Sequence, residues 1–302
     1  MAVISLDIGG TKIKGAVITP SYRIVKSIKV PTRPNKGKRY ILDTIKTIIN
    51  SLSSESKHKI TAIGVSMAGS LDMKGRLVDL ENTIPALQYT YIKRFFSRST
   101  KLPVVIENDA NCFTLAESVM GEAHDKRVTI GIIWGTGIGA GLVTQELTGR
   151  PAIYKGVSGS GLEIGHNKVY SQAFGKYIPL EKIAGGKYLP TVYKRFGGEK
   201  NLTPSEILKG MDSASKKATT ECLTQIGLSI GGLINTFNPD SIVIGGGLSN
   251  LYDSLHKRLI AKVKRFAVKE HFDNVTFSKF SLSDDEGIMG AAYLAFKKTS
   301  KK

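Results

Sequence analysis

The stretch that decides the fold is Val105-Ile106-Glu107-Asn108-Asp109-Ala110-Asn111. Val104 to Ile106 is short, apolar and β-branched, which predicts a buried strand. Polar residues follow at once, and Cys112 to Gly121 then has an apolar side and a closing glycine, which predicts a helix. A carboxylate between a strand and a helix lies at the carboxyl edge of a sheet, where open α/β folds bind their ligands. Asp109 is therefore a candidate for chemistry, with simple capping of the helix as the alternative.

The segments before this stretch predict a sheet that opens with a meander. Apolar residues recur at helical spacing from Lys38 to Leu52, which predicts a helix ahead of the central stretch. Alternation of strands and helices indicates a mixed sheet with helices packed on it. Four apolar, β-branched runs predict the strands, at 3–6, 13–18, 24–30 and 61–66.

The second half of the chain echoes the first. A strand at 128–133, a glycine-rich turn at 134–141 and a returning strand at 142–144 resemble the opening, which we interpret as a weak internal repeat. The rest predicts, in chain order, a glycine-rich loop at 156–166, a helix at 216–237, a strand at 241–244, a helix at 251–268, a strand at 275–280 and a final helix at 286–296.

Length and composition limit the class of protein. The 302 residues suffice for two domains, and a hydrophobic share of 41% can build substantial cores. The net charge of +18 attracts anions. That charge is dispersed, without a basic helix or arginine–aromatic interleaving, so we predict nucleotide phosphate rather than nucleic acid as the partner.

The sequence also predicts a cytoplasmic protein without membrane attachment. No apolar run reaches the roughly 18 residues of a membrane span, and we find no signal peptide. The two cysteines, Cys112 and Cys222, lie in unrelated contexts, which fits a reducing compartment.

Three glycine-bearing turns follow apolar strands, and such turns let the backbone approach a phosphate. Hairpin geometry alone explains any one of them, but three together, with Asp109 between the first two, favour a nucleotide site. Asp7 suits a Mg²⁺ between itself and a polyphosphate, directly or through water. The turns are Asp7-Ile8-Gly9-Gly10-Thr11-Lys12, Gly135-Thr136-Gly137-Ile138-Gly139-Ala140-Gly141 and Gly245-Gly246-Gly247.

Two familiar nucleotide motifs are excluded. No G-x-x-x-x-G-K-[ST] string occurs, so none of the turns is a P-loop. The first two turns join antiparallel strands and do not open helices, which argues against a Rossmann dinucleotide site.

These motifs, in this order, resemble the ROK family of sugar kinases and repressors, within the actin-like ATPase superfamily. The resemblance covers the chain from Val3 to the final helix and includes Leu162-Glu163-Ile164-Gly165-His166 and Leu180-Glu181-Lys182-Ile183-Ala184-Gly185-Gly186. It implies an α/β fold of two actin-like ATPase (ribonuclease H-like) domains of related topology that flank a cleft. The smaller N-terminal domain would comprise 1–116 with the C-terminal helix 286–302, and the larger C-terminal domain 117–285.

The resemblance also implies roles for individual residues. Asp109 would act as the base toward a sugar hydroxyl, and ATP would lie across the glycine turns, with Mg²⁺ near Asp7. The implied sugar contacts are Gly69, Asn108, Asp109, Glu163, His166 and Glu181. The implied nucleotide contacts are Asp7, Gly9, Gly10, Thr11, Lys12, Gly135, Thr136, Gly137, Gly245 and Gly246.

The chain departs from the family between His166 and Glu181. Most of the family carries a cysteine-rich zinc motif there, and this chain has no cysteine in that segment. A structural zinc site needs about four Cys or His ligands, so we predict no zinc and expect packing of Tyr170, Phe174 and Tyr177 to order the loop. His166 is left as a sugar contact, with a neutral core histidine as the alternative. A loop without zinc leaves the cleft more open, which would suit a disaccharide or a β-glucoside.

The loops beside the first sheet add two smaller observations. The proline-glycine that is usual in the family after the fourth strand is Ala68-Gly69 here, so this loop departs from the family pattern. Asn82 lies in a loop that can border the sugar.

The resemblance therefore implies an ATP-dependent sugar kinase that transfers the γ-phosphoryl to the 6-hydroxyl of a hexose or hexosyl glycoside. Glucose-type sugars and β-glucosides are favoured, with N-acetylmannosamine, fructose and N-acetylglucosamine open as alternatives. A different class is a non-catalytic sugar-responsive regulator. Family repressors carry an added N-terminal helix-turn-helix, for which we expect no room before Asp7. A homodimer is the expected assembly.

Overall fold

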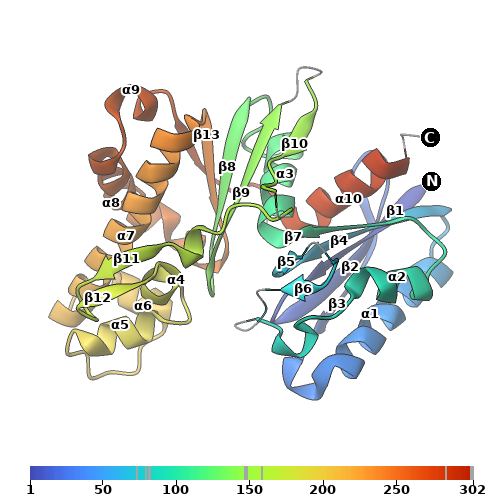
Figure 1. Cartoon of the computed structure of the whole chain (residues 1–302), viewed down its shortest axis with the longest axis horizontal. Coiled ribbons are helices and arrows are strands. Elements are labelled where there is room, and N and C mark those ends of the chain that lie inside the picture. The colour runs from blue at the N-terminus through green and yellow to red at the C-terminus, as the bar shows by residue number, and fades with distance from the viewer. Residues whose placement is uncertain are drawn as a thin grey trace. The chain divides into compact units, whose positions relative to one another are not determined.

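The computed structural model describes residues 1–72, 74–78, 80, 83–145, 149–157, 159–282 and 284–299. The chain divides into two compact units, each with a five-stranded sheet (Figure 1). The first unit is Met1–Ala116, Ile153–Gly161 and Leu282–Lys302, and the second is Glu117–Ala152 and Leu162–Ser281. The predicted α/β class is confirmed, and the domain boundaries given above stay a prediction.

The first sheet grows from the predicted meander. β1 pairs antiparallel with β2, β2 with β3, and β1 also pairs parallel with β4, which in turn pairs parallel with β7. Because β1, β4 and β7 are parallel, their carboxyl ends share one edge of the sheet. The strands are β1 (Ala2–Ile8), β2 (Lys12–Ile18), β3 (Ile24–Pro31), β4 (Ile60–Met67) and β7 (Val104–Asn108), in the order β3-β2-β1-β4-β7.

Helices cover both faces of this sheet. α1 (Gly37–Ser54) buries an apolar stripe at helical spacing against one face, together with α2 (Ile92–Ser99). α10 (Glu286–Thr299) lies on the opposite face, where the Ser5 hydroxyl donates to Ile288 O at 2.6 Å (Figure 1). Gly64 of β4 permits this close approach, because a Cβ there would collide with Ala291 O. α3 (Asp109–Met120) follows β7 directly and touches α10 where Gly290 meets the Cys112 backbone.

The second sheet has the same strand order as the first, counted along each half of the chain. β8 (Val128–Trp134) pairs antiparallel with β9 (Ile138–Gln145) and parallel with β13 (Ser241–Gly245). β10 (Pro151–Ile153) and β14 (Thr276–Lys279) lie at the two edges. The order β10-β9-β8-β13-β14 matches β3-β2-β1-β4-β7, and this common topology confirms the internal repeat.

Two long helices pack together beside the second sheet. α7 (Ser213–Phe237) is capped by the Asp212 carboxylate, which accepts from the Ser215 N–H at 2.9 Å, and it ends at Asn238 in the left-handed conformation. α8 (Tyr252–Phe266) packs along it. Among the described residues, no helix has both the length and the apolar character that a membrane crossing requires.

Several elements differ from the sequence prediction. The returning strand begins at Ile138 and not at 142, because Gly139 and Gly141 pair within the ladder and do not form the turn. α3 begins at Asp109 rather than at Cys112. The prediction missed short elements, namely β5 (Ser70–Leu71), β6 (Leu77–Val78), α2, β10, β11 (Lys168–Ser171), β12 (Lys176–Pro179), α4 (Glu181–Ala184), α5 (Leu189–Arg195), α6 (Pro204–Lys209), α9 (Lys269–Phe272) and the 3-10 turns at Pro34–Lys36, Pro85–Leu87, Ile164–His166 and Gly247–Leu251.

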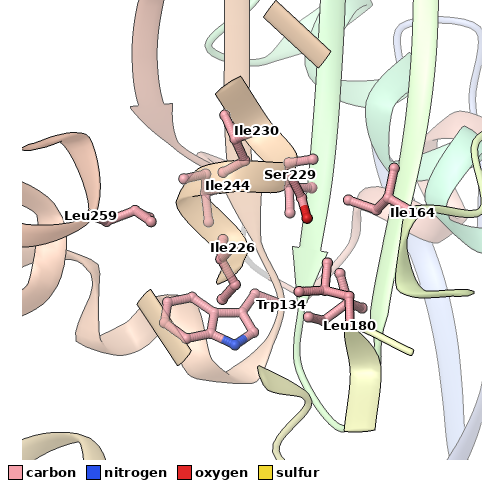
Figure 2. A pocket seen from close by; sticks show the side chains of 10 residues that line it. Trp134, Ile164, Leu180, Ile226, Ser229, Ile230, Ile244 and Leu259 are labelled. Carbon is pink, nitrogen blue, oxygen red and sulfur yellow. The ribbon is translucent and has the colours of Figure 1, made fainter. Parts of the chain in front are cut away.

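The core of the second unit contains a small cavity beside Trp134 (Figure 2). Aliphatic side chains line it, and its polar member, Ser229, donates to the Gln225 carbonyl at 2.9 Å. The space open to the centre of a water molecule is about 10 Å³, which is at the lower limit for a single water. This cavity is therefore a packing gap and not a ligand site.

The space around two glycines predicts opposite effects on stability when each is changed to alanine. Gly64→Ala should lower the free energy of unfolding by roughly 1–3 kcal/mol, because its Cβ must displace the α10 backbone. Gly232→Ala, at an exposed site on α7 with open space around a Cβ, should raise it by about 0.5–1 kcal/mol. Urea unfolding of the two variants measures both values, and a Gly64 variant as stable as the parent would refute this packing.

Candidate functional site

Polar side chains gather where the parallel strands of the first sheet end. Asp7 of β1 lies opposite Ser66 of β4, and Ser66 lies opposite Glu107 of β7. The Ser66 hydroxyl donates to Asp7 Oδ1 at 2.8 Å. The edge predicted from the sequence thus presents carboxylates from β1 and β7, on either side of β4.

Asn108 fixes the start of α3. Its Oδ1 accepts from the N–H groups of Ala110 at 2.9 Å and Asn111 at 3.2 Å, and its Nδ2 donates to Gly69 O at 3.0 Å. Asp109 is the first helical residue, and its Oδ1 also accepts from the Ala110 N–H at 2.9 Å. Asn108, more than Asp109, therefore caps this helix, which was the alternative role considered for Asp109.

A buried carboxylate supports this turn from behind. Glu107 is 5% exposed, and its Oε1 accepts from the Asn108 N–H and from Asn111 Nδ2, each at 3.0 Å. Its Oε2 pairs with the ammonium of Lys155, whose side chain is 42% exposed. Neither Glu107 nor Lys155 was predicted to have a role. A glutamate within an otherwise apolar strand was the available signal, because a buried charge requires a partner.

A small cavity opens beside Asn108 in the first unit. The space open to the centre of a water molecule is about 30 Å³, enough for a few polar atoms. Gly69, at a φ of +80°, lines it, and a Cβ there would run into the Val78 carbonyl. Its polar lining also includes Ser70, Glu107, Asn108, Lys155 and Ser160.

The first glycine turn is held by backbone contacts. The Gly9 N–H donates to Lys12 O at 3.0 Å, and the Thr32 hydroxyl donates to Gly9 O at 2.6 Å. A Cβ on Gly10 would lie 3.0 Å from Thr83 O, so glycine keeps that approach open. Thr11 is exposed at the tip of the turn.

The charged groups around this turn are largely paired within the first unit. Lys12 forms an ion pair with Asp284, which also lies 3.2 Å from Lys29, and Lys14 pairs with Asp285. The hydrogen bond from Lys12 lowers the pKa of Asp284. Because the Asp284 side chain is 62% exposed, its ion pair with Lys12 is weak. Another anion can therefore replace Asp284 as the partner of Lys12.

Asp7 is a titratable group with a raised pKa at this edge. Burial raises the pKa of its carboxyl above the ordinary value, and the hydrogen bond from Ser66 and the charge of Lys12 oppose that rise. Gly287 of α10 packs against it, since a Cβ there would lie 2.7 Å from Asp7 Oδ1.

The other two glycine turns meet in the second unit. β8 and β13 are parallel neighbours, so the turn at Gly135-Thr136-Gly137 and the turn at Gly245-Gly246-Gly247 lie at one edge. A Cβ on Gly135 would lie 3.5 Å from Gly247 N. Gly246 has a φ of +87°, and a Cβ there would lie 2.6 Å from Trp134 O, so both conformation and space require glycine.

The sugar-contact residues predicted for the second unit lie beside the first of these turns. Glu181 Oε2 accepts from the Ile138 N–H at 3.3 Å and fills the space that a Cβ on Gly137 would need. Gly165 packs on Ile138 O, and a Cβ there would lie 3.6 Å from Glu181 Cβ. The 3-10 turn at Ile164–His166 is therefore held against the glycine turn.

His166 and Glu163 face solvent on this 3-10 turn. His166 Nδ1 lies 3.5 Å from Glu163 Oε2, and their side chains are 63% and 44% exposed. The alternative of a neutral core histidine is therefore wrong for His166.

The predicted site residues thus form two groups, one in each unit. The first unit holds Asp7, Gly9, Gly10, Thr11, Lys12, Gly69, Asn108 and Asp109. The second holds Gly135, Thr136, Gly137, Glu163, His166, Glu181, Gly245 and Gly246. Asn82 lies outside the described residues.

The chain belongs to the ROK family, whose family model matches residues 3–298. The N-acetyl-D-glucosamine kinase of Haemophilus influenzae (strain 86-028NP) is 30% identical to it, over 97% of this chain and 99% of that protein. A ROK hexokinase from Thermus thermophilus has a TM-score of 0.83 at 26% identity and covers all of both chains. A ROK family glucokinase from Streptomyces griseus, solved with glucose and AMPPNP, has a TM-score of 0.78 at 25% identity, over 98% of this chain and 100% of that one. The actin-like ATPase fold is thereby confirmed.

The residues present fit a nucleotide with Mg²⁺. Kinase sites usually hold Mg²⁺ through one or two carboxylates together with phosphates and water, and Asp7 offers one such carboxylate beside a glycine turn. Among the described residues, no group of three or more His, Cys, Asp or Glu side chains is arranged to hold a metal ion by itself. A metal ion shared with phosphate is compatible with both observations.

The raised pKa predicts that Asp7→Asn stabilises the fold. Ionised Asp7 lowers the stability of the folded state at neutral pH, and this penalty fades as the pH falls through the raised pKa and the carboxyl takes up a proton. The variant should therefore be more stable than the parent at neutral pH, by a margin that shrinks in acid. Urea unfolding across pH measures this margin, and a variant that is less stable at neutral pH would contradict the account.

The Glu107–Lys155 pair predicts a rescue. Lys155→Met leaves a buried carboxylate without its cation and should lower the free energy of unfolding by about 1–3 kcal/mol. Adding Glu107→Gln removes the unpaired charge and should restore most of the loss. A double variant no more stable than Lys155→Met alone would show that the pair does not neutralise Glu107.

Proposed function

We propose that this protein is an ATP-dependent sugar kinase that transfers the γ-phosphoryl group to the 6-hydroxyl of a hexose or hexosyl glycoside. The observation that supports this most is the start of α3, where Asn108 caps the helix and leaves Asp109 at the carboxyl edge of the sheet. A carboxylate held there suits proton transfer from a bound hydroxyl.

In this proposal Asp109 is the general base. A sugar hydroxyl is a poor nucleophile, and a positioned carboxylate that takes its proton typically contributes about 10²–10⁴-fold. Asn108 contacts the sugar through the second hydrogen of Nδ2, since the bond to Gly69 uses one. The further sugar contacts are Gly69, Glu163, His166 and Glu181, whose donors and acceptors suit vicinal hydroxyls.

The glycine turns supply the nucleotide side. A phosphate group can lie close to their backbones. Lys12 then leaves Asp284 and binds a phosphate oxygen. A Mg²⁺ bound beside Asp7 would neutralise charge on the phosphoryl oxygens. The nucleotide contacts in this proposal are Asp7, Gly9, Gly10, Thr11, Lys12, Gly135, Thr136, Gly137, Gly245 and Gly246.

Among acceptors, glucose-type sugars and β-glucosides lead. The related Streptomyces glucokinase binds glucose, and the Haemophilus relative is named for N-acetyl-D-glucosamine. N-acetylglucosamine, N-acetylmannosamine and fructose are the alternative acceptors. A non-catalytic sugar-responsive regulator is the alternative from another class.

A sugar panel tests the proposal. ADP release with Mg-ATP should rise with one acceptor class among glucose, mannose, fructose, N-acetylglucosamine, N-acetylmannosamine, cellobiose and an aryl β-glucoside. The 6-deoxy form of the best acceptor should give no sugar-dependent ADP, because it lacks the accepting hydroxyl.

Nucleotide binding serves as the control. The single tryptophan, Trp134, directly precedes the turn at 135–137 and can report nucleotide binding by fluorescence. A folded protein that binds ATP but shows no sugar-dependent turnover would contradict the kinase and favour the regulator. Turnover with the 6-deoxy sugar would show that a hydroxyl on another carbon accepts the phosphoryl group.

A further inference from the structure

The chain between two of the proposed sugar contacts forms a hairpin. β11 and β12 pair antiparallel, with Val169 opposite Ile178 and both side chains buried. His166 lies just before the hairpin and Glu181 just after it. The Leu180 N–H closes the base by donating to Asn167 O at 2.9 Å. The hairpin therefore brings His166 and Glu181, which flank it in the sequence, to the same end.

The other end of the hairpin is bound by a carboxylate from α7. Glu221, which is 4% exposed, accepts at Oε1 from the Ser171 hydroxyl at 2.6 Å and the Gln172 N–H at 2.8 Å. Its Oε2 accepts from the Ala173 N–H at 3.3 Å. One helical turn later, Gln225 Nε2 donates to Tyr170 O at 2.9 Å. These bonds join the hairpin to the longest helix of the second unit.

Packing of the aromatic side chains contributes less to ordering this hairpin than we predicted from the sequence. Tyr170 and Tyr177 stack edge to face at 5.5 Å, but their exposed fractions are 47% and 69%. Phe174 lies under the Arg195 guanidinium at 5.0 Å. Glu221 accepts three hydrogen bonds from the hairpin tip, so it is the main anchor of that tip.

We propose that Glu221 is a positioning residue for the sugar site: by clamping the hairpin tip to α7, it supports the places of His166 and Glu181 at the base, together with their contacts to the glycine turn. This inference rests on the proposed function, because it assigns Glu221 to the same sugar site. Glu221 does not touch the sugar and acts through the hairpin. Its loss should therefore weaken sugar binding more than nucleotide binding.

Glu221→Gln tests the clamp with little change in volume. The amide has a single carbonyl acceptor, so it leaves at least one of the Gln172 and Ala173 N–H groups unpaired. We expect the KM for the sugar to rise roughly 10-fold, as the loss of one bond to a charged group would give. The KM for ATP and kcat should stay within about 2-fold. Hydrogen exchange should accelerate by about 10-fold or more at whichever of the Gln172 and Ala173 amides loses its acceptor.

Asp212→Ala is the matched control. The Asp212 carboxylate also accepts from a backbone N–H and from a serine hydroxyl, both of Ser215, but it does so at the start of α7, away from the hairpin. This variant should lower the melting temperature without changing the KM for the sugar. Ser171→Ala should shift the KM for the sugar in the same direction as Glu221→Gln, by less.

The outcomes separate this inference from the proposed function. Unchanged amide exchange in Glu221→Gln would show that the clamp is absent. Faster exchange with an unchanged KM for the sugar, or an equal rise in Asp212→Ala, would show a purely structural role. A parent that neither phosphorylates nor binds any sugar of the panel by calorimetry would overturn the proposed function and the positioning role with it, whereas failure of this inference alone appears only in the variants.

Discussion

The rest of the candidate site depends on the hydrogen bonds of one amide, the side chain of Asn108. Its oxygen caps α3 and its nitrogen holds the Gly69 carbonyl, so a strand end, a helix start and a neighbouring loop are fixed by one group. Glu107 supports the same turn from the buried side, with its charge balanced by Lys155. Asp109 is consequently presented by a rigid element, which is what a positioned base requires.

Chemistry and stability oppose each other at Asp7. A carboxylate at the end of a buried strand, packed against α10, is desolvated, and its pKa rises. Serine and lysine neighbours reduce this penalty without removing it. Such a group is unfavourable for folding, so its presence at the glycine turn favours a role with a cation or phosphate. Small residues on β4 and α10 make the close packing possible.

The sequence predicted those parts that depend on local pattern. Continuous β-branched runs indicated the core strands, and strand–glycine turn–strand repetition indicated the common topology of the two sheets. It could not predict bonds between distant residues, such as Asn108 with Gly69, Lys155 with Glu107, or Glu221 with Ser171. The β11–β12 hairpin was missed because its strands are short and largely polar on one face. Gly139 and Gly141 were assigned to a turn, since composition alone does not reveal their pairing in the ladder.

The central claim is that Asp109 takes the proton from the accepting hydroxyl, and turnover by Asp109→Asn tests it most directly. Asparagine keeps an Oδ1 for the Ala110 N–H, so α3 should begin as before. The account predicts that kcat with the best acceptor falls by about 10²–10⁴-fold, while the affinities for sugar, by calorimetry, and for nucleotide, by Trp134 fluorescence, change little. Turnover within about 2-fold of the parent would contradict the account and remove Asp109 as the base.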